Sequence, residues 1–156
     1  MKIMAFSGPS NSGKTTLIIK LINYFKNKDL KIAVLKHDPS DKAYFDKEGK
    51  DSFKFQHAGA NTMVLSPTRL STFMRGEFDV EYCIKMANNV DIFLIEGLKH
   101  LPYPRISVFC KELNYDYFAY SNAIASYIKP NIDKDWLYLD DIENIANYIL
   151  QNALDY

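Results

Sequence analysis

The segment GPSNSGKTT at residues 8–16 restricts the fold of this chain more than any other, because it matches G-x-x-x-x-G-K-[ST] at every fixed position. The run Ile3-Met4-Ala5-Phe6 before it is apolar, which is typical of a buried strand. After it, apolar residues recur with the spacing of one helical face: Leu17, Ile18, Leu21, Ile22 and Phe25. A strand, a glycine-rich loop and a helix in this order are the context of a phosphate-binding loop (P-loop).

The residue types of this segment fit the binding of a nucleoside triphosphate. Gly8 and Gly13 permit backbone angles that a Cβ would forbid, so that backbone N–H groups can converge on an anion. Lys14 supplies a point charge for the β- and γ-phosphates, and Thr15 supplies a hydroxyl for Mg²⁺. A turn that binds nothing would not require both glycines together with the Lys-Thr pair. The predicted nucleotide-binding residues are Gly8, Ser10, Asn11, Ser12, Gly13, Lys14, Thr15 and Thr16.

Size and composition favour one globular domain over residues 1–156, with 47% hydrophobic and 24% charged residues. The formal net charge is zero, so a nucleic-acid partner, which calls for a basic surplus, is not expected. The sequence shows no signal peptide and no apolar run of membrane-spanning length, which predicts a cytoplasmic protein without a membrane partner. Neither Cys83 nor Cys110 lies in a C-x-x-C pair, which argues against structural zinc, and Cys110 is expected to be a buried hydrophobe.

Continuous apolar runs alternate with amphipathic segments along the chain, which predicts the α/β class. We expect a P-loop NTPase fold, with a mostly parallel sheet and helices on both of its faces. Strands are expected at residues 31–36, 61–66, 70–74, 90–95, 105–110 and 117–121, the first of them buried on both faces. Helices are expected from the P-loop to residues 27–29, at 53–58, at 79–89 and after a cap at Asp140 or Asp141. The polar residues 39–50 indicate a loop.

The two short apolar segments between residues 61 and 74 are open to two interpretations. They could form a small β-hairpin that projects from the domain, or both could lie in the main sheet. An exposed hairpin that carries Phe73 and Met74 would favour pairing of two chains across a two-fold axis.

Two acidic residues, Asp91 and Glu96, are candidates for the carboxylate that binds Mg²⁺ or orients a water molecule. Their positions at opposite ends of the strand at 90–95 decide between them. Ligands of open α/β sheets lie beyond the carboxyl ends of the strands. Asp91 begins this strand and Glu96 follows it, and a five-residue strand places the two ends roughly 16 Å apart. Glu96 is therefore the predicted catalytic and metal-binding carboxylate, and the alternative is a loop carboxylate paired with Lys99.

Other ionisable residues are expected on the same rim of a parallel sheet. Lys36, His37 and Asp38 follow the strand at 31–36, and Lys99 lies just beyond Glu96. A dense set of ionisable groups at such a rim is typical of a functional site, although a lone histidine at a strand end is often an ordinary loop residue. Asp46 and Asp51 are weaker candidates, since a helix cap explains Asp51 without a function.

Several stretches together resemble the molybdopterin-guanine dinucleotide biosynthesis protein B family. They are GPSNSGKTT at 8–16, LKHD at 35–38, GKDSFKFQHAGA at 49–60 and DIFLIEGLK at 91–99. They occur in the order of the family and cover most of the first hundred residues, whereas the likeness beyond about residue 105 is general. One departure is that Asp38-Pro39-Ser40 follows His37, where the family often has further histidines.

The resemblance implies a P-loop protein that binds GTP and Mg²⁺ and hydrolyses GTP weakly. It also implies a homodimer that acts as an adaptor for molybdopterin guanylyltransferase, the enzyme that attaches GMP to molybdopterin, with molybdopterin itself a candidate ligand. The residues carried over to the site around the P-loop are Lys36, His37, Asp38, Asp51, Ser52, Glu96 and Lys99.

Two other functions stay open from the sequence. A P-loop small-molecule kinase usually carries several lid arginines, and this chain has only Arg69, Arg75 and Arg105. A GTP-dependent metallochaperone would need a Cys/His metal cluster, which the sequence does not show. The sequence also lacks an N-K-x-D motif, which recognises guanine. The choice of GTP as the nucleotide therefore comes from the resemblance alone, and ATP stays an alternative.

Overall fold

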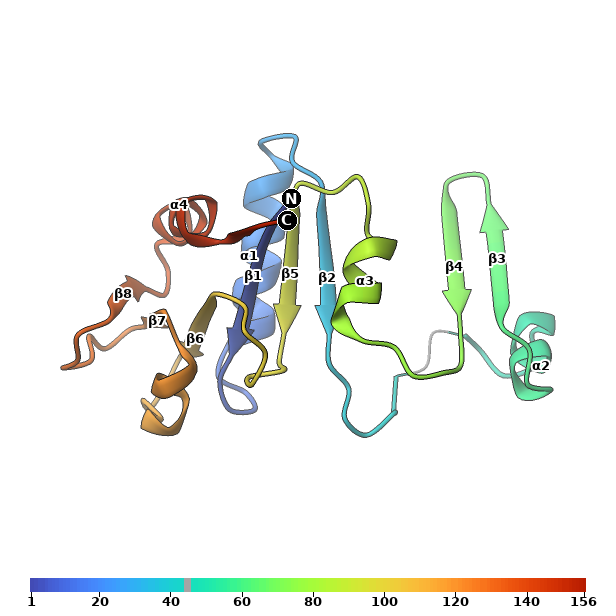
Figure 1. Ribbon diagram of the computed structural model, residues 1–156, viewed down its shortest axis with the longest axis horizontal. Coiled ribbons are helices and arrows are strands. Elements are labelled where there is room, and N and C mark those ends of the chain that lie inside the picture. Colours follow the sequence, from blue (N-terminus) through green and yellow to red (C-terminus); the bar gives the residue numbers. More distant parts are fainter. Residues whose placement is uncertain (44–45) are drawn as a thin grey trace. The chain divides into compact units, whose positions relative to one another are not determined.

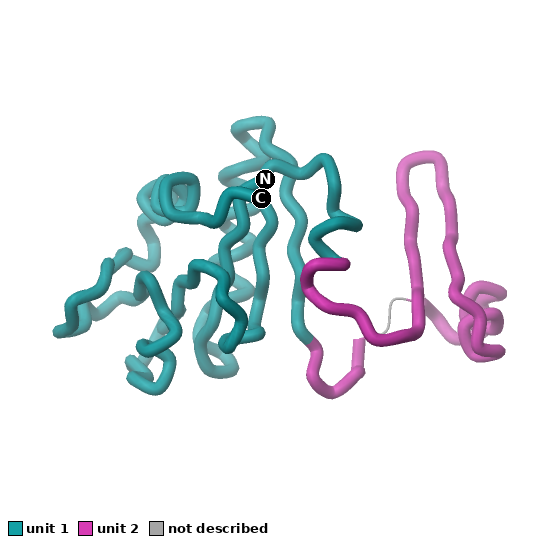
Figure 2. The backbone as a smooth tube through the Cα atoms, in the orientation of Figure 1, with its two compact units in different colours: residues 1–37, 83–156 teal, residues 38–82 magenta. Residues whose placement is uncertain are grey.

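The computed structural model describes residues 1–43 and 46–156, which divide into two compact units. Unit 1 comprises residues 1–37 and 83–156, and unit 2 comprises residues 38–82 (Figure 2). Helix α3 (Val80–Met86) spans the boundary between these ranges. The expectation of one domain over residues 1–156 stays a prediction, and each unit is described by itself.

Unit 1 is built on a seven-stranded, mostly parallel sheet (Figure 1). The order β2-β5-β1-β6-β7-β8 is wholly parallel, and β9 pairs antiparallel with the first residues of β1. This arrangement confirms the predicted α/β class and parallel sheet. The strands are β1 (Lys2–Ser7), β2 (Ile32–Lys36), β5 (Ile92–Glu96), β6 (Arg105–Phe109), β7 (Ala123–Ser126), β8 (Asp135–Tyr138) and β9 (Leu154–Asp155).

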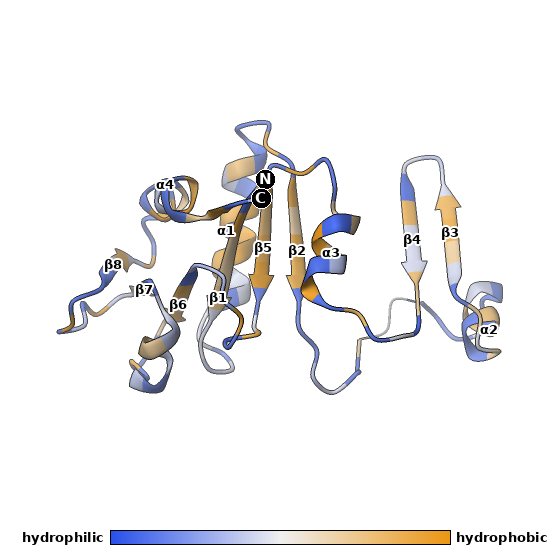
Figure 3. Cartoon of the chain, viewed as in Figure 1, coloured by the Kyte–Doolittle hydropathy of each residue, from blue (hydrophilic) through white to orange (hydrophobic). Residues whose placement is uncertain are grey.

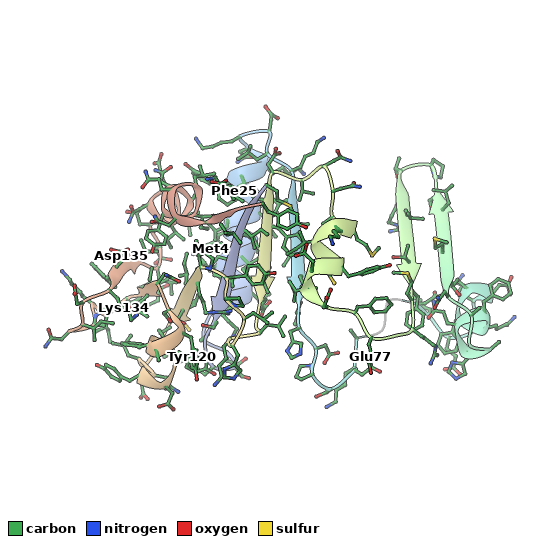
Figure 4. The ribbon with its side chains drawn as sticks, viewed as in Figure 1. Met4, Phe25, Glu77, Tyr120, Lys134 and Asp135 are labelled. Atoms are coloured by element: carbon green, nitrogen blue, oxygen red, sulfur yellow. The ribbon has the colours of Figure 1, made fainter. Side chains whose placement is uncertain are left out.

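Alternating side chains of the sheet enter apolar clusters on its opposite faces, among them a larger one and a smaller one, because successive residues of a strand face opposite sides. The larger cluster packs β1, β5 and β6 against α1 (Lys14–Lys26) and α4 (Ile142–Asn152), and Met4 and Phe25, labelled in Figure 4, belong to it. The smaller cluster packs Phe109 and Ile124 against Phe118 of the 3₁₀ helix η1 (Tyr115–Tyr120). The apolar character of β1 and β5 is visible in Figure 3. Among the helices of the described residues, none combines the length and apolar character needed to cross a bilayer.

The strand predicted at residues 117–121 is wrong, because this segment forms η1. The side chain of Asn114 accepts a hydrogen bond from the N–H of Asp116 and so starts a helical turn. Phe118 then enters the smaller cluster, and Tyr117 packs against it. Tertiary packing and a local cap therefore override the strand preference of aromatic residues.

The prediction that the strand at 31–36 is buried on both faces is also wrong. β2 is the last strand at its side of the sheet, and Val34 keeps 42% of its surface exposed. The position of a strand within a sheet depends on the topology, which an apolar run alone does not reveal. The sheet also contains the short strands β7 and β8, which the apolar pattern of the sequence did not predict.

Unit 2 contains α2 (Asp51–His57) and the antiparallel pair β3 (Thr62–Ser66) and β4 (Arg69–Phe73). The pair forms a two-stranded sheet of its own, so the alternative in which both strands lie in the main sheet is wrong. The predicted hairpin is confirmed, with its turn at Pro67-Thr68.

A chain of buried hydroxyl groups ties the end of β1 to its neighbours. The Oγ atoms of Ser7 and Ser107 are 2.6 Å apart, and those of Ser107 and Ser121 are 2.5 Å apart. Ser121 donates to the carbonyl of Tyr117 at 2.8 Å. Because each hydroxyl has one proton, Ser107 must donate to Ser121 and Ser7 to Ser107. This directed chain fixes Ser7, the residue just before the P-loop.

We predict that Ser107→Ala lowers the free energy of unfolding by about 1–3 kcal/mol, because the buried hydroxyl of Ser7 loses its acceptor. Denaturant unfolding measures this change. Ser40→Ala, which alters an exposed serine, serves as the control and should stay within about 0.5 kcal/mol of the wild type. Equal stability of Ser107→Ala and the wild type would show that the hydroxyl chain does not stabilise this end of β1.

Candidate functional site

The P-loop between β1 and α1 needs glycine at both of its conserved positions. Gly8 has φ +139° and Gly13 has φ +93°, and Asn11 is left-handed at φ 60°. A Cβ on Gly8 would lie 2.6 Å from the carbonyl oxygen of Val108, and one on Gly13 would lie 3.2 Å from Cβ of Cys110. The loop therefore curls tightly against the end of β6.

The backbone and side chain of Cys110, just beyond β6, hold the tip of the loop in place. Its N–H donates to the carbonyl of Ser12 at 3.0 Å, and its Sγ donates to the carbonyl of Asn11 at 3.5 Å. Cys110 is half-buried and lines the cavity around the loop, so the expectation of a fully buried cysteine is wrong. The reason is that this residue lies after the strand rather than within it.

The ammonium group of Lys14 folds back over the loop. Its Nζ donates to the carbonyls of Gly8 at 2.9 Å and Pro9 at 2.7 Å, and to Oγ of Ser12 at 3.4 Å. Burial lowers the pKa of Lys14, the nearby carboxylate of Glu96 raises it and Lys36 lowers it again. The charge is thus partly dehydrated and satisfied mainly by neutral oxygens, which an anion can replace with a stronger, charge-assisted bond.

Thr15 and Glu96 form an oxygen pair beside Lys14. The Oγ1 of Thr15 donates to Oε1 of Glu96 at 3.3 Å. Glu96 ends β5 and is half-buried, and the strand register sets it level with Phe6 of β1 and Lys36 of β2. A hydroxyl and a carboxylate are the hard oxygen ligands that Mg²⁺ takes, with phosphate and water completing its octahedron. The residues present therefore fit a magnesium ion bound together with a nucleotide.

An open cavity of about 620 Å³ surrounds these groups, and the P-loop forms most of its wall. Lys36 and Glu96 close one side and Cys110 the other. The residues that the sequence assigned to the nucleotide therefore lie together in this wall, apart from Gly8. The lining residues are Ser10, Asn11, Ser12, Gly13, Lys14, Thr15, Thr16, Lys36, Glu96 and Cys110.

Asp91, the rival of Glu96, lies at the opposite end of the strand. Its carboxylate accepts a hydrogen bond from the N–H of Lys31 at 2.7 Å, where the chain enters β2. The backbone N–H of Asp91 in turn donates to the carbonyl of Lys31 at 2.8 Å. Asp91 therefore joins the amino ends of two strands and has no part in the P-loop rim.

Among the described residues of unit 1, the cavity wall includes Lys36 but neither His37 nor Lys99. The N–H of His37 donates to the carbonyl of Glu96 at 3.0 Å, while its side chain is exposed. The ammonium group of Lys99 lies over two rings of η1, 5.3 Å from Tyr117 and 5.5 Å from Tyr120. The alternative in which Glu96 pairs with Lys99 does not match these contacts.

The remaining predicted site residues lie in unit 2, and their link to the P-loop stays a prediction. The carboxylate of Asp38 accepts hydrogen bonds from the N–H groups of Ser40, Lys42 and Ala43, at 3.1, 2.6 and 2.7 Å. Asp51 begins α2 and pairs with Lys54 at 3.1 Å. Ser52 hydrogen-bonds Asp46, which lowers the pKa of that carboxyl together with the N–H of Lys47.

Arg105 is the functional residue that sequence reasoning missed. Its side chain is buried, and its guanidinium donates to the carbonyls of Gly97, Leu98 and Leu101 at 2.8, 2.9 and 3.2 Å. Burial lowers its pKa. These bonds fix the loop that follows Glu96, in which Leu98 is left-handed at φ 51°. The one signal in the sequence is an arginine at the start of an apolar strand, which the sequence analysis named only among the few arginines of the chain.

Comparison with known proteins supports the resemblance that the motifs suggested. The family model of molybdopterin guanine dinucleotide synthesis protein B matches residues 3–128, which include all of those motifs. The molybdopterin-guanine dinucleotide biosynthesis adapter protein of Escherichia coli is 30% identical over 163 residues, covering 96% of this chain and 91% of the relative. The adapter protein of Haemophilus influenzae is 29% identical over 155 residues, covering 94% and 86%.

Solved structures extend the likeness to the whole fold. The crystal structure of Bacillus subtilis MobB superposes with a TM-score of 0.82 and 26% identity, and each chain is covered in full. A crystal structure of molybdopterin-guanine biosynthesis protein B superposes with a TM-score of 0.78 and 26% identity, covering 96% of this chain and 97% of the other. With the family model matching most of its residues, this chain belongs to the molybdopterin-guanine dinucleotide biosynthesis protein B (MobB) family.

Proposed function

We propose that this protein binds GTP with Mg²⁺ at the P-loop cavity and works as an adaptor in the attachment of GMP to molybdopterin. Relatives that share its family are named biosynthesis adapter proteins, which supports a role in the same pathway. The partner we propose is molybdopterin guanylyltransferase, bound in a manner that depends on the nucleotide. Such coupling requires that GTP has different affinities for the free and the partnered protein.

The observation that carries the nucleotide site is the position of Lys14. Its ammonium group is half-buried and held by the loop carbonyls of Pro9 and Gly8 at 2.7 and 2.9 Å. Phosphate oxygens would exchange these neutral acceptors for charged ones, while the amino end of α1 adds a partial positive charge. Thr15 and Glu96 then bind Mg²⁺, directly or through water, next to the terminal phosphate.

The arrangement of arginines supports slow hydrolysis. The guanidinium group of Arg105 donates its hydrogen bonds to loop carbonyls. Within unit 2, Arg75 donates to the carbonyl of Gln56 at 3.1 Å and lies over the ring of Phe73. An arginine that reaches the transferring phosphoryl group raises the rate about 10³–10⁵-fold, and the described residues of unit 1 supply none in the cavity wall. Turnover should therefore lie well below the about 1–100 s⁻¹ of kinases.

The same adaptor is proposed to act as a homodimer through the hairpin of unit 2. Cross-strand pairing places Leu65 opposite Leu70, and Met63 lies on the same face two residues along β3. These three side chains are 83%, 59% and 70% exposed. The register puts Phe73, which we expected at the interface, on the other face of the hairpin with Thr62. An exposed apolar face of this kind suits a second copy of the chain.

We predict that Lys14→Ala weakens Mg²⁺·GTP binding about ten- to a hundred-fold, since one charge-assisted contact is lost. Glu96→Gln should reduce hydrolysis and the Mg²⁺ dependence of binding, while nucleotide binding without Mg²⁺ persists. Calorimetric titration and a phosphate-release assay measure both. Lys26→Ala, which removes an exposed lysine from the last turn of α1, is the matched control. Unchanged affinity in Lys14→Ala would refute the phosphate site, and rapid phosphorylation of a small molecule would favour a kinase.

For the dimer, sedimentation of the wild type at micromolar concentration should give twice the mass of one chain. Leu65→Asp should shift it to the monomer, because a charge is then buried in the paired faces. Ile19→Asp changes a 53% exposed apolar residue of α1 in the same way and should leave the dimer intact. A monomeric wild type would contradict the dimer, whereas a Leu65→Asp dimer would move the interface away from this hairpin face.

A further inference from the structure

A second cavity adjoins the phosphate cavity on the other side of the P-loop tip. It has a volume of about 350 Å³. Ser10, Asn11, Ser12 and Cys110 line both cavities, so the two meet along the tip of the loop. The second cavity extends from there toward the segment beyond β6. Its lining residues are Pro9, Ser10, Asn11, Ser12, Phe109, Cys110, Lys111 and Glu112.

The order of the strands predicts how a bound nucleotide is oriented along the P-loop. β5 and β2 lie on one side of β1, and they end in Glu96 and Lys36. The metal ligands and the terminal phosphate therefore belong at that side of the P-loop. β6 lies on the opposite side of β1 and leads into Cys110. A triphosphate that lies along the loop with its terminal group near Glu96 thus directs its nucleoside toward β6 and the second cavity.

The residues that line the second cavity include a buried aromatic residue, an anchored cysteine and two charged residues. Phe109 is buried and packs against Phe118 and Ile124. Cys110 is fixed to the loop by its bonds to Ser12 and Asn11. The next two residues, Lys111 and Glu112, are exposed and follow directly from this anchor. A cation and a carboxylate therefore stand side by side at the edge of a small cavity where a base would arrive.

We propose that this cavity is the nucleobase subsite and that Lys111 and Glu112 select guanine over adenine. This inference rests on the proposed nucleotide site. The pairing edge of guanine presents an acceptor, O6, followed by the donors N1–H and N2–H₂. An ammonium donates to the first and a carboxylate accepts from the other two. Adenine carries the donor N6–H₂ in place of O6 and the acceptor N1 in place of N1–H. The ammonium group of Lys111 would then face a donor, and the carboxylate of Glu112 would face an acceptor.

Lys111 and Glu112 thereby recognise guanine in place of the N-K-x-D motif, which this chain lacks. Sites that hydrogen-bond a polar group of the ligand reject an analogue without it, because their own polar groups are then left without partners. Losing one charge-assisted contact corresponds to about ten- to a hundred-fold in affinity, which is the selectivity expected here.

The test is a set of equilibrium titrations of the full chain with GTP, ATP and xanthosine triphosphate, each with Mg²⁺. The wild type should prefer GTP over ATP by about ten-fold or more. Glu112→Gln should lower the affinity for GTP, bring the ratio of GTP to ATP close to one and raise the affinity for xanthosine triphosphate. The last change is expected because an amide can donate to the carbonyl that xanthine carries in place of the guanine amino group. Glu48→Gln, an exposed glutamate of unit 2, is the control and should keep the wild-type ratio.

The outcomes separate this subsite from the proposed function. Binding of GTP that is lost in Lys14→Ala, with an unchanged ratio of GTP to ATP in Glu112→Gln, overturns the base subsite and leaves the phosphate site standing. Equal affinities of the wild type for GTP and ATP overturn it as well. Absence of any nucleotide binding by the wild type overturns the proposed function, and the base subsite with it.

Discussion

The close packing of the P-loop against the end of β6 is the constraint on which the rest of the site depends. A Cβ on Gly8 would clash with the carbonyl oxygen of Val108, and a Cβ on Gly13 would make a tight contact with Cys110 at a left-handed φ. The loop ends at the left-handed Gly13, and α1 starts directly at Lys14. The buried hydroxyl of Ser7 fixes the strand end from which the loop departs. A side chain on either glycine would therefore disturb the proposed phosphate site and its contact with β6 together.

Around this loop, each neighbouring strand contributes one group at its carboxyl end. β5 brings Glu96 to Thr15, and β2 brings Lys36 to the cavity wall. β6 leads to Cys110, which secures the tip of the loop. The guanidinium of Arg105 holds the segment after Glu96 by the backbone carbonyls of Gly97, Leu98 and Leu101. This division of roles is what a parallel sheet offers a ligand at one rim.

The elements that the sequence predicted well are those determined by local pattern. The P-loop has a spacing that fixes its own geometry, and Glu96 could be placed because an apolar run shows where a strand ends. The predictions failed where contacts with residues far away in the sequence determine the local structure. The segment at 117–121 became η1 because Phe118 found a place beside Phe109, and the brace formed by Arg105 depends on carbonyls of another loop. The exposed edge of β2 followed from strand order, which no single segment contains.

We propose that the ammonium group of Lys14 exchanges loop carbonyls for nucleotide phosphates. The direct test is a crystal structure of the protein with Mg²⁺ and a non-hydrolysable GTP analogue. We expect Nζ of Lys14 to leave the carbonyls of Gly8 and Pro9 and to contact the β- and γ-phosphates, with Thr15 on the metal ion. A structure in which the analogue binds elsewhere while Lys14 keeps its bonds to the loop would contradict the claim.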